Sequence, residues 1–133
     1  MDRLVSALGA SPVDWGSKTA CCGASLSITR TDIVLDLSAR ILAEARAAGA
    51  DAVAVACPLC HANLDGRQHQ MTPPPGPSPV GRSADRGGGN EIPVFYFTQL
   101  MALAFGLGEK AAALSKNMVD TRPLLEKKGF FAP

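Results

Sequence analysis

The residues of this chain best suited to chemistry are its four cysteines, which occur as two pairs. Cys21 and Cys22 are adjacent and precede Gly23, whereas Cys57 and Cys60 belong to the sequence Cys-Pro-Leu-Cys. Adjacent cysteines are poorly suited to a mutual disulfide, because that bond distorts the peptide between them. Neighbouring side chains also diverge, so packing in a core does not explain the first pair. The pattern therefore indicates a site that uses sulfur chemically.

Four explanations compete for these sulfurs. A structural zinc site needs four tetrahedral ligands, and adjacent cysteines rarely provide two of them. A metal-free dithiol would use Cys57 as nucleophile and Cys60 as resolving thiol, but it gives Cys21 and Cys22 no role. Free buried cysteines explain two clustered pairs poorly. A multi-iron cluster explains the adjacency best, because diverging neighbours can bind different irons. Gly23 would then let the backbone pass close to the cluster.

Both pairs are expected where one structural element ends and the next begins. The sequence AVAVA, residues 52–56, is typical of a strand buried on both faces of a parallel sheet. Cys57 follows it directly, and Pro58 suits the first turn of a helix. After the first pair, apolar residues recur at helical spacing over residues 33–45. Since helix amino termini favour thiolates, we expect the four sulfurs to converge at the carboxyl edge of the sheet.

The rest of the sequence continues the alternation of strands and helices. Residues 1–9 predict a helix closed by a glycine, and residues 12–15 a short strand. Residues 92–97 predict a strand that leads into a helix capped by Thr98, and the remainder a short helix and a basic tail. Residues 71–90 are rich in proline and glycine and predict a disordered insertion. We therefore predict a single α/β domain built from residues 1–70 and 91–133.

Composition and charge exclude several other functions. With 133 residues, 47% of them hydrophobic, the chain is long enough to bury one core. Its net charge of +1 predicts no nucleic-acid surface. The amino terminus lacks the features of a secretory signal, and the uncharged stretch 92–108 fits a strand and a helix better than a membrane span. We expect a cytoplasmic protein, in which cysteines serve as metal ligands or redox groups.

The cysteine motif and its flanking sequences resemble a known family. The chain is similar to the CCG domain found in the B subunit of heterodisulfide reductase, specifically the carboxy-terminal one. Relatives include iron-sulfur subunits of glycolate and lactate oxidation and of certain succinate or thiol:fumarate reductases. The similarity lies in Cys21-Cys22-Gly23, the Cys-Pro-Leu-Cys sequence and their surroundings: KTACCGASLSITRTDIV, AGADAVAVACPLCHANLD and IPVFYFTQLMALAFGLG. It covers nearly the whole chain outside the insertion.

The resemblance implies a Rossmann-like parallel sheet with flanking helices and a non-cubane [4Fe-4S] cluster. Cys21, Cys22, Cys57 and Cys60 match four ligands of the family motif, with Gly23 beside them. The chain would be one subunit of a heterodisulfide-reductase-like oxidoreductase, incomplete or inactive alone. It would receive electrons from a subunit that carries a flavin or a conventional iron-sulfur cluster, and would pass them to a disulfide. A metal-free dithiol oxidoreductase and a zinc-stabilised interaction module remain the alternatives.

The family motif begins with a further cysteine on the first strand of the sheet, and no cysteine precedes Cys21 here. We therefore expect a sheet without its first strand, whose neighbouring strand exposes unpaired backbone groups. The chain would be a fragment or half of a split subunit, and another chain would supply the strand and the fifth cysteine. His61 is an alternative ligand, but a histidine there is more often solvated or capping. We interpret Lys18 and Arg30 as solvated charges.

Overall fold

The computed structural model describes residues 1–71 and 91–130, and a parallel sheet of two strands forms its centre. Strand β1 (Val53–Val55) pairs with β2 (Val94–Tyr96) in register over all three residues of each. A parallel pair requires a crossover connection, and helix α3 (Pro58–Gly66) is part of it. The predicted α/β class is therefore confirmed. Two parallel strands with flanking helices agree with part of a Rossmann-like fold.

The predicted insertion falls almost entirely outside the described residues, which exclude 72–90 and 131–133. Its first residue, Met71, is described and packs half-buried against the core. On either side of the excluded stretch, Gln68 and Ile92 are joined by two hydrogen bonds. The Gln68 side-chain amide donates to the Ile92 carbonyl at 2.8 Å, and its oxygen accepts from the Ile92 amide at 3.0 Å. These buried bonds hold β2 close to the end of α3.

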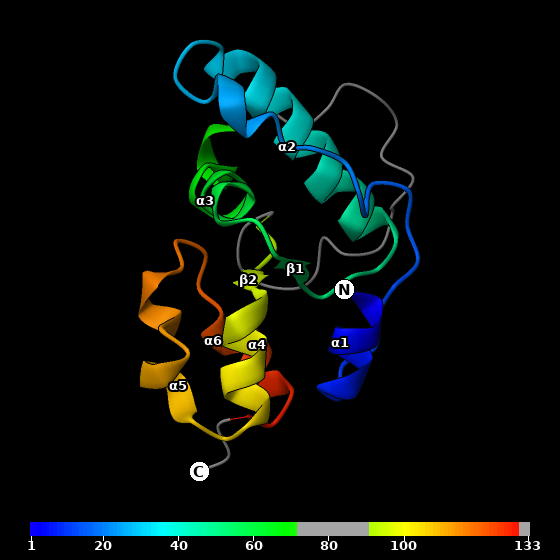
Figure 1. The fold of residues 1–133 in the computed structure, drawn as a ribbon, viewed down its shortest axis with the longest axis vertical. Coiled ribbons are helices and arrows are strands. Elements are labelled where there is room, and N and C mark those ends of the chain that lie inside the picture. The colour runs from blue at the N-terminus through cyan, green and yellow to red at the C-terminus, as the bar shows by residue number, and fades with distance from the viewer. Residues whose placement is uncertain (72–90, 131–133) are drawn as a thin grey trace.

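Helices α2 (Thr31–Ala47) and α3 cover one face of the sheet, and Figure 1 shows them together on one side of it. The apolar spacing predicted α2, and its buried face confirms the prediction: Val34, Ile41, Leu42 and Ala45 are all buried. This face packs with Val53, Val55, Leu64, Ile92 and Val94 in one hydrophobic cluster, which also contains Cys22. The first cysteine pair is therefore attached to the core through one of its members.

Helices α4 (Phe97–Ala104), α5 (Gly108–Ala111) and α6 (Arg122–Lys127) lie on the other side of the sheet (Figure 1). A second hydrophobic cluster fills this layer with Phe95, Leu103, Ala112, Leu114 and Leu125. The molecule thus has three layers, with the sheet buried on both faces as its apolar sequence predicts. No helix in residues 1–71 or 91–130 has the length and apolar character that crossing a membrane requires.

Two local predictions are wrong. Residues 12–15 form no strand, because no described strand lies beside them to complete a ladder; they run as an irregular segment after α1 (Asp2–Ala7). Thr98 does not cap α4, which begins one residue earlier. The Gln99 side chain accepts from the Tyr96 amide at 2.9 Å instead, and it donates to the Ala112 carbonyl at 3.0 Å. Single-turn 3-10 helices complete the fold at Ala24–Leu26, Gln68–Gln70 and Leu114–Lys116.

Candidate functional site

Cys57 and Cys60 lie at the junction of β1 and α3, as the sequence predicted. Cys57 is the residue before the helix, with an extended backbone (φ −102°, ψ 123°), and Pro58 occupies the first turn. Cys57 is exposed, whereas Cys60 is half-buried because it faces the core from the first turn of α3. One cysteine of the pair therefore lies at the surface, and the other contacts the hydrophobic cluster.

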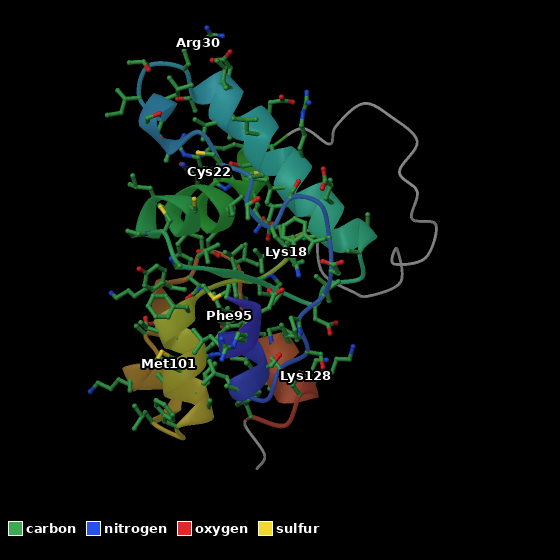
Figure 2. The ribbon with its side chains drawn as sticks, turned by 45° about the vertical axis from the view of Figure 1, so that its right-hand side comes forward. Lys18, Cys22, Arg30, Phe95, Met101 and Lys128 are labelled. Atoms are coloured by element: carbon green, nitrogen blue, oxygen red, sulfur yellow. The ribbon has the colours of Figure 1, made fainter. Side chains whose placement is uncertain are left out.

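Cys22 connects the first cysteine pair to the second. It is fully buried, and its Sγ lies 3.3 Å from the Sγ of Cys60, a residue 38 positions away in the sequence. Figure 2 shows Cys22 on the segment that precedes α2, at a place between α2 and α3. The side-chain amide of Asn63, itself buried, donates to Cys22 Sγ at 3.6 Å and to Ser27 Oγ at 3.2 Å. The fold thus brings two distant thiols together under an amide donor.

Cys21 points away from this contact, as expected for the neighbour of a buried side chain. It is exposed, and its Sγ accepts a hydrogen bond from the Gly23 amide at 3.4 Å. Gly23 adopts a φ of +75°, which side chains disfavour, and a Cβ there would lie 2.9 Å from Leu37 Cδ1 on α2. The backbone conformation therefore explains why the motif has a glycine at this position, which the sequence alone did not indicate. It lets the chain turn directly after the two cysteines.

The two thiols of the second pair differ strongly in acidity. The backbone amide of Cys60, followed by its side chain and the amide of Leu59, lowers the pKa of Cys57 below its ordinary value. Burial raises the pKa of Cys60 to about 12, and the neighbouring Cys22 and Cys57 add to that effect. Without a cation, the site therefore holds one exposed, reactive sulfur beside one that stays protonated.

This difference predicts the order of alkylation in reduced, metal-free protein. We expect iodoacetamide at pH 7 to modify Cys57 at least about tenfold faster than Cys60, because the thiolate is the reacting form. Peptide mass spectrometry over time gives both rates. In urea the two rates should become similar, since unfolding removes the burial and the helix start. Equal rates in the folded protein would contradict the predicted acidities.

The facing sulfurs of Cys22 and Cys60 suit a positively charged group. Cys22 and Cys60 face each other closely, and only a cation would stabilise both as thiolates. No three His, Cys, Asp or Glu side chains within the described ranges are placed to hold a single metal ion.

The other sequence candidates lie outside this group of sulfurs. His61 Nε2 is 3.1 Å from the Val94 carbonyl and 3.4 Å from the side-chain amide of Asn117, so the ring faces β2. Lys18 forms ion pairs with Asp2 at 2.7 Å and Asp14 at 3.3 Å. Arg30 pairs with Asp32 at 2.7 Å. Both charges are therefore already partnered within the chain.

Asn63 is the site residue that the sequence analysis missed. It lies three positions after Cys60 in α3, a spacing that places two side chains on the same helical face. The sequence contained this spacing, but it indicates a role for Asn63 only once Cys22 is known to pack against the same face of the helix. The amide supplies a hydrogen bond to sulfur, which is the usual way a protein adjusts the potential of a metal–thiolate site.

Comparison with known proteins shows what the chain is similar to. Residues 1–65, which include all four cysteines, match the family model described as the cysteine-rich domain CCG. This part of the chain therefore resembles the CCG domain, and relatives that match most of the chain show which kind of protein it is similar to. It is 30% identical over 128 residues, 95% of its length, to the B subunit of the ferredoxin/F420H2-dependent CoB-CoM heterodisulfide reductase from Methanosarcina acetivorans. The predicted resemblance to this heterodisulfide reductase component is thus confirmed.

A bacterial relative widens the comparison. The chain is 28% identical over 123 residues, 92% of its length, to the 8-methylmenaquinol:fumarate reductase membrane anchor subunit of Wolinella succinogenes. In both relatives the matched part is 39% of the protein. The chain therefore spans about two fifths of the length of the curated relatives that it matches. Both relatives are named as subunits of reductases.

Proposed function

We propose that this chain is an iron-sulfur subunit of a heterodisulfide-reductase-like oxidoreductase in the cytoplasm. When bound, a non-cubane [4Fe-4S] cluster would supply the electron transfer to a disulfide. The CCG domain and the two reductase subunits support this class of function. The observation that carries the proposal is the 3.3 Å contact between Cys22 and Cys60, which joins the two motif pairs at one place.

Each side chain of the site would bind or stabilise the cluster from a different direction. Cys22 and Cys60 would bind on the inner side, where burial keeps water from their sulfurs. Cys57 would bind from the start of α3, whose amide groups already favour its thiolate. Cys21 would bind from the outer side of the loop, since its side chain diverges from that of Cys22. Asn63 would stabilise the sulfur of Cys22 through its hydrogen bond.

Partner subunits are part of this proposal. The relatives are named as subunits of reductases, and we propose that this chain also works with other subunits. A subunit with a flavin or a conventional iron-sulfur cluster would deliver the electrons. A partner chain would also supply a fifth cysteine, as the family motif implies. The exposed position of Cys57 at the end of β1 is compatible with a ligand arriving from outside.

The direct test is metal analysis after anaerobic reconstitution with iron and sulfide. We expect about four irons and about four acid-labile sulfides per chain, with a brown colour, because the cluster has that composition. Zinc supplied in competition should not replace the iron. A colourless protein that binds about one zinc and no iron would contradict the proposal and favour a structural zinc module.

A metal-free dithiol oxidoreductase is the second candidate, and the acidity of the second pair favours it. A low pKa at exposed Cys57 and a high pKa at Cys60 suit an attacking and a resolving thiol. The contact of Cys60 with Cys22 argues against it, because Cys22 competes with Cys57 for the same partner. If this candidate is correct, serine at both Cys21 and Cys22 will leave disulfide reduction by metal-free protein intact.

A further inference from the structure

Three of the four cysteines form a series of contacts in which Cys60 has the middle position. Its Sγ lies 3.3 Å from the Sγ of Cys22, and its side chain also interacts with that of Cys57 at the start of α3. Cys57 is exposed, Cys60 is half-buried and Cys22 is fully buried. The three sulfurs therefore form a path from the solvent to the interior, along which a disulfide bond can move by exchange.

The contact between Cys22 and Cys60 is close to the geometry of a disulfide. A sulfur–sulfur bond is about 2.0 Å long, so the two atoms need to approach by only about 1.3 Å. Figure 2 shows Cys22 beside α3, the helix that carries Cys60. The buried amide of Asn63 donates to Cys22 Sγ at 3.6 Å and holds the side chain in this place. Folding has therefore already closed most of the loop that a bond between residues 22 and 60 requires.

The Cys-Pro-Leu-Cys sequence by itself predicts a different bond, between Cys57 and Cys60. That bond closes a loop of only a few residues, whereas a bond between Cys22 and Cys60 spans 38 positions. A disulfide constrains the unfolded chain more when its loop is longer, so the longer-range bond stabilises the folded chain more. Cys22 also belongs to the hydrophobic cluster, and Cys60 packs against it. We therefore expect the folded chain to favour the Cys22–Cys60 bond at equilibrium.

An oxidant in the solvent reaches the buried pair through Cys57. This thiol is exposed, and its side chain interacts with that of Cys60. Cys21 is exposed as well, but its sulfur points away from the contact between Cys22 and Cys60. A bond between Cys21 and its neighbour Cys22 would distort the peptide that joins them. Oxidation of Cys21 is therefore not passed to the buried pair.

We propose that the metal-free chain is oxidised by low-molecular-weight disulfides at Cys57 and keeps the oxidation as a buried disulfide between Cys22 and Cys60. The Cys57 thiolate attacks one sulfur of the small disulfide, forms a mixed disulfide and releases the first small thiol. Cys60 then attacks the Cys57 sulfur and releases the second small thiol. Finally, Cys22 attacks the Cys60 sulfur and releases Cys57. The protons of Cys60 and Cys22 pass to the departing thiolates, so two protein thiols are oxidised and one small disulfide is reduced to two thiols.

The buried disulfide is a reversible state of the site before it receives a cofactor. An excess of reduced thiol returns it to free cysteines by the same exchange, as for the transient disulfides of reducing compartments. Under the proposed function, the oxidised chain lacks two of its four sulfur ligands and cannot accept the cluster until it is reduced. This consequence rests on the proposed function, whereas the disulfide itself depends only on the fold.

Oxidised glutathione is the probe, added in excess and without oxygen to the full, reduced, metal-free chain. Free thiols are then blocked with N-ethylmaleimide, and trypsin leaves one cysteine pair in residues 19–30 and the other in residues 47–67. Fragmentation in the mass spectrometer locates the bond. We expect the two peptides to be joined through Cys22 and Cys60, with Cys57 blocked as a free thiol. This product should exceed the Cys57–Cys60 bond at least about tenfold, because its loop is longer.

The other possible products contradict the proposal. A dominant bond between Cys57 and Cys60 would overturn it and favour the metal-free dithiol oxidoreductase. A glutathione adduct that stays on Cys57 without an internal bond would overturn it as well. In urea, the proportion of the Cys22–Cys60 bond should fall at least about tenfold, because an unfolded chain joins near neighbours more readily. An unchanged proportion in urea would show that the fold does not select this bond.

Two variants of the metal-free chain test the entry through Cys57. Cys57→Ser should form the Cys22–Cys60 bond at least about tenfold more slowly, because no exposed sulfur then passes the exchange to the buried pair. Cys21→Ser removes the other exposed thiol, and the bond should form at the native rate. Equal rates for the two variants would overturn the proposed entry, and circular dichroism checks that both fold. Because iron is absent throughout, these results and those of the cluster proposal are independent.

Discussion

Replacing Cys57 with serine is expected to lower the affinity of the site for its iron more than about 100-fold, so that the reconstituted protein retains much less iron than the native chain. Loss of an outer-shell partner already lowers metal affinity about 10–100-fold, so loss of a direct sulfur ligand should exceed that range. The substitution should not disturb the fold, because Cys57 is exposed and precedes α3, where serine is a favoured capping residue. Iron and sulfide analysis after anaerobic reconstitution measures the effect, and circular dichroism checks the helices.

Cys22→Ser should cause the same loss of iron, but it also changes the core. Cys22 is fully buried, so its replacement by a hydroxyl reduces stability as well as removing a ligand. Comparing the two variants separates ligation from folding. Ser25→Ala is the matched control, since Ser25 is exposed and lies near the first pair. If Cys57→Ser keeps native iron content while Cys22→Ser does not, Cys57 is not a ligand and the proposed ligand set is wrong.

Local patterns in the sequence predicted the elements that carry the cysteines. The helical spacing identified α2, and the AVAVA run identified β1, because both signals arise from burial of one face or of both faces. Pro58 correctly marked the start of α3. These features depend on residues that are close in sequence, so they can be read without the structure.

The features that were not predicted depend on contacts between distant residues. The Cys22–Cys60 contact spans 38 positions, and the role of Asn63 exists only because of it. Gln99 and Asn117 satisfy backbone groups of β2, which no local rule assigns to glutamine or asparagine at those positions. The prediction of a strand at residues 12–15 is wrong for the same reason, since a strand needs a neighbouring strand that the local sequence does not reveal. The divergence of Cys21 and Cys22 was predictable, but which of the two would be buried was not.

The stability of the sheet should depend on Phe95 more than on most other side chains. Phe95 is 2% exposed and lies in β2, where it forms the second hydrophobic cluster with Leu103 and Leu125. Figure 2 shows it in the interior of the molecule. Phe95→Ala should lower the free energy of unfolding by about 3–5 kcal/mol, because the cavity adds to the lost apolar burial. Native domains have only about 5–15 kcal/mol in total, so the variant should be close to unfolding.

Urea unfolding followed by far-UV circular dichroism measures this loss, and Phe105 supplies the matched control. Phe105 directly follows α4 and is 65% exposed, so Phe105→Ala should change the free energy of unfolding by no more than about 0.5 kcal/mol. Equal effects of the two substitutions would contradict the described core.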